Sequence, residues 1–424
     1  MLANPLNQYK TCFNYDLSLP HSALNNTETT NIIQFIKESK NIELDYLLQP
    51  EGYSLSPEIS QWLDVFCTAY ALNYAGPVLL FSTETLVKTF KFLQSLQTSH
   101  QVQFLMAAKS MNESAIFNTA SQYLAGFDVS NQNEYNLLPN SLENKIVFVT
   151  APLLSQSLSV FSNKNNKLCF TINSIEQYEQ FYSKQANFEY CIRLDASELL
   201  NQFYESLGEK TYASHFGVSP NNLIALKKMI NPYFRGFHMH SGKAEGNLPQ
   251  AYELMAEKAL MLAAELNVEL QYLNLGGGIV YLSNEELAEL IVRIRKIVPV
   301  HIQLYFEPGR FLTKNAGYAV TRIASVNHKN TFTDIILDIS SQCHLRWTDP
   351  MLIAPACIQE EKISLRLFGP TCAEIDYLGD FRFPHEMKHL LVRNNILLLG
   401  GITGYSASWN TAFNGIPPAK IIVI

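Results

Sequence analysis

The stretch LQYLNLGGGIVYLSNEELAELIVRIRKIVPVHIQLYFEPGR, residues 270–310, contains one complete strand–helix–strand repeat. The runs at 270–275 and 302–307 are short and apolar, as expected for buried strands. Between them, apolar residues recur at helical spacing behind a capping box formed by Ser283 and Glu286. Short buried strands that alternate with helices are typical of a parallel sheet.

Six similar runs precede this repeat. They are VQFLMAA (102–108), AGFDVS (125–130), KIVFVT (145–150), LCFTIN (168–173), EYCIRL (189–194) and FRGFHMH (234–240). Eight strands that alternate with helices over a stretch of this length match the plan of a TIM-type barrel. The sequence therefore predicts an α/β fold with a (β/α)8 barrel.

The last hundred residues differ in character, because short strands follow one another with few helices between them. The runs are VTRIASV, FTDIILDI, ISLRLFG, NNILLLGG and KIIVI. We expect a barrel over 83–315, opened by a helix that starts near Glu84, and a mostly β domain over 316–424. Residues 1–82 are expected to contribute to the β domain.

Composition narrows the class of protein. The chain has 47% apolar and 16% charged residues and a formal net charge of −7, which gives no electrostatic reason to expect nucleic acid or an anionic membrane as partner. Seven scattered cysteines without a CxxC pair argue against a disulfide framework or a zinc cage, so no metal is expected. Without a recognisable signal peptide or long apolar run, the expected location is the cytoplasm.

Residues that follow barrel strands are candidates for chemistry, because such barrels carry their active sites at the C-terminal ends of the strands. These are Lys109, Asp128, His238, Ser241, Gly276, Gly277, Gly278, Glu307 and Arg310. The glycines and Arg310 follow the seventh and eighth strands, which is where such barrels commonly bind phosphate. The pattern indicates a phosphorylated ligand or cofactor.

Three of these residues have two interpretations each. Lys109 ends an apolar run and could form a Schiff base with an aldehyde cofactor, or simply extend from a strand end toward solvent. His238 could stack on an aromatic cofactor or be a core histidine. Glu307 could keep a pyridine nitrogen protonated, or form a plain ion pair with Arg310.

The β domain has motifs of its own. In LFGPTCAEIDYLGD, Cys372 lies in a turn near Asp376, although a structural cysteine would look the same. The segment GYSASWNTAFNG, with Tyr405, Phe413 and Asn414, favours a ligand-facing loop. Asp338 follows an apolar strand, where it could bind a substrate amine or cap a turn.

Taken in order, AAK, GFDVSNQNE, GFHMHSG, LNLGGG, EPGR, GPTC and GYSASWNTAFNG resemble the fold-type III pyridoxal-phosphate decarboxylases. These enzymes act on ornithine, arginine, diaminopimelate or carboxynorspermidine. The resemblance extends from about residue 76 to the end of the chain. It implies a pyridoxal 5'-phosphate cofactor, an amino-acid-derived substrate and a homodimer with shared active sites.

The resemblance also implies residue roles. Lys109 would carry the cofactor, His238 would stack on its ring and Glu307 would bind its nitrogen, while Cys372 from the partner subunit would protonate the α-carbon. Asp128 and Glu134 would order the surroundings of the lysine, and Asp376 would lie near the cysteine. The phosphate would be held by Ser241, Gly277, Gly278, Gly309, Arg310 and Tyr405, and the substrate by Asp338, His344, Ala373, Asp376, Phe413 and Asn414.

Departures from the family pattern bear on the substrate. Ala373 stands where ornithine and diaminopimelate enzymes usually have an acidic residue, and His240 replaces a common glycine. Such features resemble decarboxylases of carboxylate-type siderophore pathways, so the leading hypothesis is a citrate-conjugated amino acid, with His240, His344 or Arg346 as candidates to receive its carboxylates. A polyamine or lysine precursor is the alternative. A non-catalytic relative and a racemase are further possibilities, and Glu307 and Cys372 weigh against the racemase.

Overall fold

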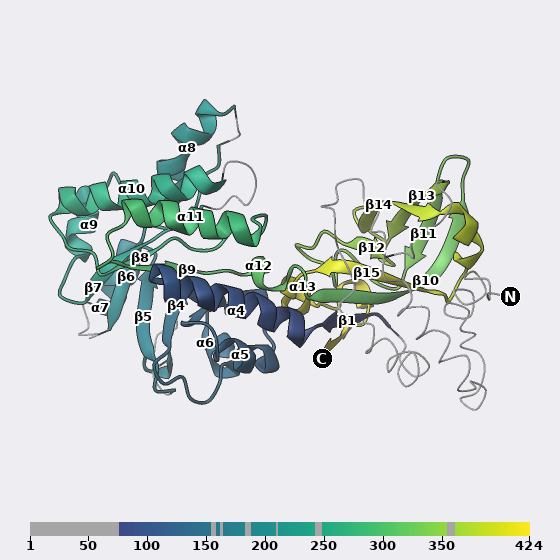
Figure 1. Ribbon diagram of the computed structural model, residues 1–424, viewed down its shortest axis with the longest axis horizontal. Helices are drawn as coiled ribbons and strands as arrows, with labels where there is room; N and C mark the ends of the chain where they lie inside the picture. The colour runs from purple at the N-terminus through teal and green to yellow at the C-terminus, as the bar shows by residue number, and fades with distance from the viewer. Residues whose placement is uncertain are drawn as a thin grey trace. The chain divides into compact units, whose positions relative to one another are not determined.

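The computed structural model describes residues 76–153, 158–161, 164–182, 188–208, 211–241, 248–353 and 361–424. The chain divides into two compact units (Figure 1). One unit is Val87–Leu312, called the barrel unit below. The other comprises, among the described residues, 76–86 together with Thr313–Ile424, and is called the β unit. The N-terminal part of the predicted β domain, up to residue 75, lies outside the described residues.

The barrel unit contains a closed barrel of eight parallel strands. They are β2 (Val102–Ala107), β3 (Gly126–Val129), β4 (Ile146–Thr150), β5 (Lys167–Ile172), β6 (Glu189–Arg193), β7 (Phe234–His238), β8 (Tyr272–Asn274) and β9 (Gln303–Phe306). Pairing of β9 with β2 closes the ring, with Val102 beside Leu304. Each run predicted from the sequence overlaps one of these strands, which confirms the predicted barrel.

Helices connect the strands on the outside of the barrel, where Figure 1 shows α10 and α11 side by side. The helices are α4 (Thr83–His100), α5 (Ser114–Ala120), α6 (Gln132–Leu137), α7 (Ile175–Tyr182), α8 (Ala196–Ser206), α9 (Leu223–Met229), α10 (Leu248–Leu266), α11 (Asn284–Ile297) and α12 (Arg310–Thr313), with short 3-10 turns η1 (Ala108–Ser110) and η2 (Leu158–Phe161). The predicted capping box opens α11, since Glu286 N donates to Ser283 Oγ and Ser283 N to Glu286 Oε2.

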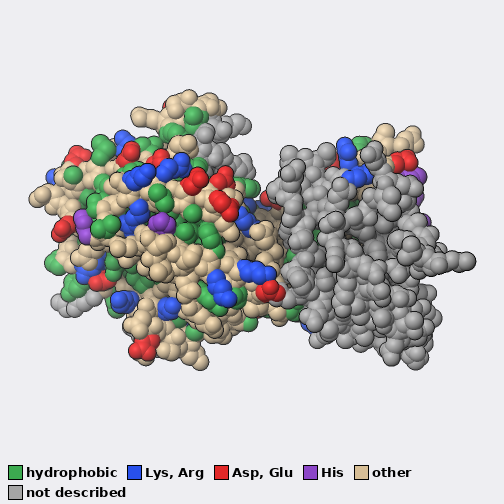
Figure 2. All heavy atoms as spheres, in the orientation of Figure 1, with side chains coloured by type: hydrophobic (Ala, Val, Ile, Leu, Met, Phe, Trp, Pro, Cys, Tyr) green, Lys and Arg blue, Asp and Glu red, His purple; other side chains and the backbone are tan. Residues whose placement is uncertain are grey.

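Apolar side chains fill the inside of the barrel. The cluster consists of Leu105, Ile146, Phe148, Cys169, Cys191 and Tyr305, all of them buried. Such packing is usual for TIM-type barrels, whose interiors are cores and not channels. On the face shown in Figure 2, positive and negative side chains are interspersed over the barrel unit. In the described part of the chain, no helix combines the length and apolarity that crossing a membrane requires.

The β unit is an eight-stranded sheet in which β12-β15-β10-β11-β13-β14 lie in that order, and β1 pairs with β10 and β16. The strands are β1 (Val78–Phe81), β10 (Gly317–His328), β11 (Thr333–Leu337), β12 (Met351–Ile353), β13 (Lys362–Phe368), β14 (Tyr377–Pro384), β15 (Ile396–Ile402) and β16 (Lys420–Val423). The 3-10 turn η3 (His385–Leu390) follows β14. This architecture confirms the predicted mostly β part of the fold.

The segment 404–415 differs from its prediction. Instead of a loop it contains α13 (Gly404–Trp409) and the 3-10 turn η4 (Phe413–Gly415). Contacts with distant residues hold α13 in place: Ser406 Oγ lies 2.8 Å from Thr348 Oγ1, and Thr313 Oγ1 accepts from Gly404 N. The helix has only six residues, too few to show a clear helical periodicity in the sequence, and contacts with distant residues fix it.

Candidate active site

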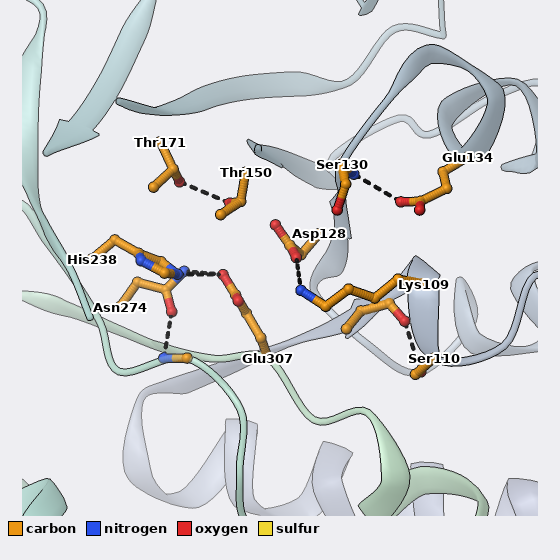
Figure 3. A network of polar contacts seen from close by, with 12 residues as sticks. Lys109, Ser110, Asp128, Ser130, Glu134, Thr150, Thr171, His238, Asn274 and Glu307 are labelled. Carbon is orange, nitrogen blue, oxygen red and sulfur yellow. Dashed lines mark hydrogen bonds and ion pairs between the residues drawn. The ribbon is translucent and has the colours of Figure 1, made fainter. Parts of the chain in front are cut away.

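Four of the predicted residues meet at the C-terminal end of the barrel (Figure 3). Lys109 lies in η1 directly after β2, and its Nζ is 3.7 Å from Oδ2 of Asp128 near the end of β3. His238 ends β7, and Glu307 follows β9. Although the run before it is buried, the Lys109 side chain itself is 44% exposed, so the amine is accessible from the barrel mouth.

Asp128 is a buried acidic residue with a raised pKa and, in the described part of the chain, without hydrogen-bond partners. It is 1% exposed, and neither of its oxygens has a hydrogen-bond partner among the described residues. Burial raises the pKa of Asp128 well above its usual range, and the charge of Glu307 adds to the rise, while the Lys109 ammonium opposes it. A carboxylate kept buried at such a cost points to a polar group that approaches it during function.

Glu307 and His238 form a buried pair, with Oε1 of the glutamate 3.2 Å from Nε2 of the histidine. Burial lowers the pKa of His238. Burial alone would raise the pKa of Glu307, but His238, Lys109 and a hydrogen bond from Asn274 outweigh it, so the pKa falls below its usual range. The site therefore holds an ionised carboxylate deep in the barrel mouth.

The glycine turn after β8 packs closely against its neighbours. Gly276 has φ +68°, and a Cβ at this position would lie 2.6 Å from the backbone oxygen of Met239. At Gly277 a Cβ would lie 2.6 Å from the backbone oxygen of Glu307. Only glycine fits both positions. The turn thus presents bare backbone next to the end of β7, where Ser241 is fully buried.

These donors fit pyridoxal phosphate. An accessible amine suits the aldehyde, an ionised buried carboxylate suits a protonated ring nitrogen, and an imidazole can stack on the ring. A glycine turn beside a serine suits the phosphate. The oxygens of Asp128, which lack a hydrogen-bond partner among the described residues although Lys109 lies 3.7 Å from Oδ2, are a further place for a polar group.

Comparison with known proteins agrees with this geometry. The family model described as "Pyridoxal-dependent decarboxylase, pyridoxal binding domain" matches residues 84–314, a little over half of the chain. The chain belongs to the pyridoxal-dependent decarboxylases. Pyridoxal phosphate is accordingly its cofactor, and decarboxylation is its reaction.

Curated relatives of this decarboxylase are similar over most of their length. It is 23% identical to the carboxynorspermidine/carboxyspermidine decarboxylase of Campylobacter jejuni, over 82% of this chain and 92% of that protein. It is also 23% identical to the diaminopimelate decarboxylase of Neisseria meningitidis, over 83% and 90%. The lysine/ornithine decarboxylase of Vibrio vulnificus, solved with cadaverine, shares the fold with a TM-score of 0.69, at 18% identity, over 88% and 100% of the two chains.

In the β unit of the decarboxylase, Asp376 organises the turn that carries Cys372. Its Oδ1 accepts from Ser341 N at 2.8 Å, and its Oδ2 accepts from Thr371 N at 3.1 Å and from Thr371 Oγ1 at 2.7 Å. Ser340 Oγ donates to both oxygens. Cys372 itself is exposed, and a pocket of about 380 Å³ adjoins it, with Ala373 also in its lining.

Other predicted residues of the β unit have structural contacts. Asp338 Oδ1 accepts from Thr321 Oγ1 at 2.6 Å and from Arg322 N, so it links β10 to the end of β11. His344 is fully buried, with Ser340 N donating to its Nδ1 and Pro417 O at 3.0 Å from its Nε2. Both ring nitrogens thus have partners within the protein, which gives this histidine a structural role.

Aromatic side chains gather around Tyr405. Its ring lies 5.0 Å from that of Trp347, and the Arg346 guanidinium lies 5.3 Å from the Trp409 ring. Phe413 is 57% exposed, and Asn414, in η4, has φ +58°. The remaining predicted residues lie in the barrel unit. Gly309 comes just before α12, and the next residue, Arg310, lies over the Tyr281 ring. Gly278 has φ +93°, and the Glu134 carboxylate accepts a hydrogen bond from Ser130 N.

The structure adds site residues that the sequence did not reveal. Arg193, at the end of β6, lies 4.4 Å from the Phe216 ring, and burial lowers its pKa although Glu307 and Asp128 oppose this. Asn274 bridges Glu307 and the glycine turn. Tyr252 donates to the backbone oxygen of Gly277. A polar residue at a strand end, as in LQYLNLGGG and EYCIRL, was the available signal for the first two.

Proposed function

We propose that this decarboxylase removes the α-carboxylate, as carbon dioxide, from an amino-acid-derived precursor of a polyamine or of lysine. The observation that carries the proposal is the meeting of Lys109 and Asp128 with the buried pair of His238 and Glu307 at the barrel mouth. The names of the curated relatives support a substrate with a second amine. They favour this alternative over the citrate-conjugated substrate that Ala373 and His240 first indicated.

When bound, pyridoxal phosphate supplies a carbonyl that captures an amine and a ring that accepts the electron pair left by carbon dioxide. Lys109 would hold it covalently, and Asp128, with Glu134 beyond it, would orient the lysine. His238 would cover one face of the ring, and the ionised Glu307 would hold the proton at the ring nitrogen. Ser241, Gly277, Gly278, Gly309 and Arg310 would receive the phosphate, and Tyr405 stays a proposed further phosphate ligand.

Cys372 is the proposed proton donor to the α-carbon, supplied by the second subunit of a homodimer. Its exposure supports this role, as does Ile375 on the same turn, whose apolar side chain is 71% exposed. An exposed apolar residue beside an exposed thiol suits a surface that another chain covers. Asp376 fixes the turn, and Asp338, Ala373, Phe413 and Asn414 stay proposed neighbours of the substrate. His344 does not, because it is buried and both of its ring nitrogens are occupied.

The proposed compartment is the reducing cytoplasm. Cys169, Cys191, Cys343 and Cys372 are free thiols, three of them buried. Free cysteines suit a compartment that keeps thiols reduced.

Absorption spectroscopy and carbon dioxide release test the assignment of Lys109. Wild-type protein loaded with cofactor is expected to show the visible absorption of a lysine-bound cofactor and to release carbon dioxide. Lys109→Ala should lose both while keeping its far-ultraviolet circular dichroism. Lys91→Ala, an exposed lysine on α4, is the matched control and should behave as wild type. A Lys109→Ala protein that keeps the absorption band would refute the assignment.

A substrate panel tests the substrate class. Carboxynorspermidine, diaminopimelate, ornithine and lysine are compared with citryl-ornithine and citryl-diaminopropionate, each followed by the mass loss of carbon dioxide. Turnover of one of the first four supports the proposal. Turnover of only a citrate conjugate would refute the proposal and support the siderophore hypothesis, for which Ala373 is the sequence evidence.

A further inference from the structure

We infer that Asn274 is a positioning residue that holds the Glu307 carboxylate and the glycine turn after β8 in one fixed relation. The inference rests on the proposed role of Glu307 toward the ring nitrogen of the cofactor. It adds a residue that acts through Glu307 and through the backbone.

The contacts of Asn274 use both ends of its side-chain amide. It is the last residue of β8 and is fully buried. Its Nδ2 donates to Glu307 Oε1 at 2.7 Å, and its Oδ1 accepts from Gly276 N at 2.9 Å. One end must therefore donate to an anion while the other accepts from a backbone amide, which an asparagine of this length does and an apolar side chain does not.

Backbone hydrogen bonds around Asn274 connect the same segments as its side chain. Glu307 N donates to Gly276 O, and Met239 N donates to Asn274 O, both at 2.8 Å. The side chain thus connects the ends of β8 and β9, and the backbone oxygen of Asn274 adds the end of β7. These are the strands that carry the proposed ring and phosphate contacts. A shift of the asparagine would move the carboxylate and the turn together.

Asn274 also decides which carboxylate oxygen faces the cofactor. The described contacts of Glu307, from Asn274 Nδ2 and from His238 Nε2 at 3.2 Å, both fall on Oε1. We therefore assign Oε2 to the ring nitrogen. Loss of the Asn274 contact would let the carboxylate turn and would remove a hydrogen bond that favours its ionised form.

The test is a double-mutant cycle with the cofactor dissociation constant as its readout. Asn274→Leu is compared with wild type, Glu307→Ala and the double variant. Because hydrogen bonds to buried charges are strong, Asn274→Leu should raise the dissociation constant roughly 10- to 100-fold. In the Glu307→Ala background the same change should raise it less than about 3-fold, the remainder reflecting the glycine turn.

Gln97→Leu is the matched control. The Gln97 side-chain amide also binds backbone groups, since its Oε1 accepts from Phe104 N and Ala125 N, both at 3.1 Å. These contacts lie at the opposite end of the barrel strands from the candidate active site. Gln97→Leu should leave the cofactor affinity unchanged. If Asn274→Leu does not fold, Asn274→Ser removes the same contacts without a bulky apolar group and takes its place.

A pH profile gives a second readout. Removing the donor should raise the pKa of Glu307, so that this carboxylate is protonated at a higher pH. As the pH is lowered, cofactor affinity should therefore begin to fall earlier in Asn274→Leu than in wild type or Gln97→Leu. Equal effects of Asn274→Leu with and without Glu307, or wild-type affinity in Asn274→Leu, would overturn the inference. Absence of a Lys109-dependent absorption band in the wild type would instead overturn the proposed function.

Discussion

Asp376→Asn keeps the shape of the side chain and removes its charge, so it tests whether the turn that carries Cys372 depends on a carboxylate. Both oxygens of Asp376 accept from a backbone N–H, Oδ1 from Ser341 and Oδ2 from Thr371. Hydroxyl groups can rotate to accept from an amide, whereas a backbone N–H cannot. In either orientation of the substituted side chain, one backbone N–H must therefore face the new NH2 group.

The magnitude follows from the two contacts. A buried N–H left without an acceptor costs about 1–3 kcal/mol, and the remaining bond loses its charge assistance, which is worth roughly 1 kcal/mol more. The new amide should turn its NH2 toward Thr371, where the present bond is longer, at 3.1 Å against 2.8 Å for Ser341. We expect the free energy of unfolding of the β unit to fall by about 2–4 kcal/mol.

Urea unfolding followed by tryptophan fluorescence measures this loss, because Trp347 and Trp409 lie in the β unit. Carbon dioxide release should fall with stability, while cofactor affinity of the folded protein should not change. Asp349→Asn, an exposed carboxylate of the same unit, is the control and should stay within about 0.5 kcal/mol of wild type. An unfolding free energy for Asp376→Asn equal to that of the control would refute the reasoning.

Three further predictions concern the candidate active site and the proposed dimer. Gly277→Ala places a Cβ 2.6 Å from the backbone oxygen of Glu307, so we expect a loss of about 1–3 kcal/mol of stability and weaker cofactor binding, and a wild-type melting curve would contradict the packing described. Asp128→Asn removes a carboxylate whose pKa is raised by burial, so at pH 7 it should melt at a higher temperature than wild type without cofactor, and the gain should vanish as pH falls below about 4, where the wild-type group is protonated in both states. Lys109→Ala and Cys372→Ala should each lack activity alone, and mixing them under subunit exchange should restore part of it; an inactive mixture that contains heterodimers would exclude a shared site.

The barrel was predictable because its strands are buried on both faces and read as apolar runs between helices. The predicted helix from Ser283 was equally clear, since its capping box and apolar stripe act locally. Lys109, Asp128, His238 and Glu307 could be brought together because strand ends of one barrel share a rim. None of these inferences needed information about distant side chains.

Other features depend on contacts that no local pattern encodes. The network of Asp376 joins residues more than thirty positions apart, from Ser340 to Thr371. Helix α13 has six residues and is held by polar and aromatic contacts with residues more than fifty positions away, such as Thr348 and Trp347, so no local pattern predicted it. Asn274 looked like any polar residue before a glycine turn until its two hydrogen bonds were located. Tyr252 acts through the backbone of Gly277, and a tyrosine in a helix gives no such hint.

Packed apolar side chains fill the interior of the barrel whose rim carries the candidate active site. Leu105, Phe148 and Tyr305 pack together inside the barrel, and Cys169 and Cys191 belong to the same buried cluster. Under the proposed function, we expect substrate and products to enter and leave at the rim where Lys109 and Glu307 lie. If the substrate is the proposed polyamine precursor, its long tail would have to run outward from the reacting carbon. We then expect changes of chain-length preference to come from residues beyond the rim and not from this buried cluster.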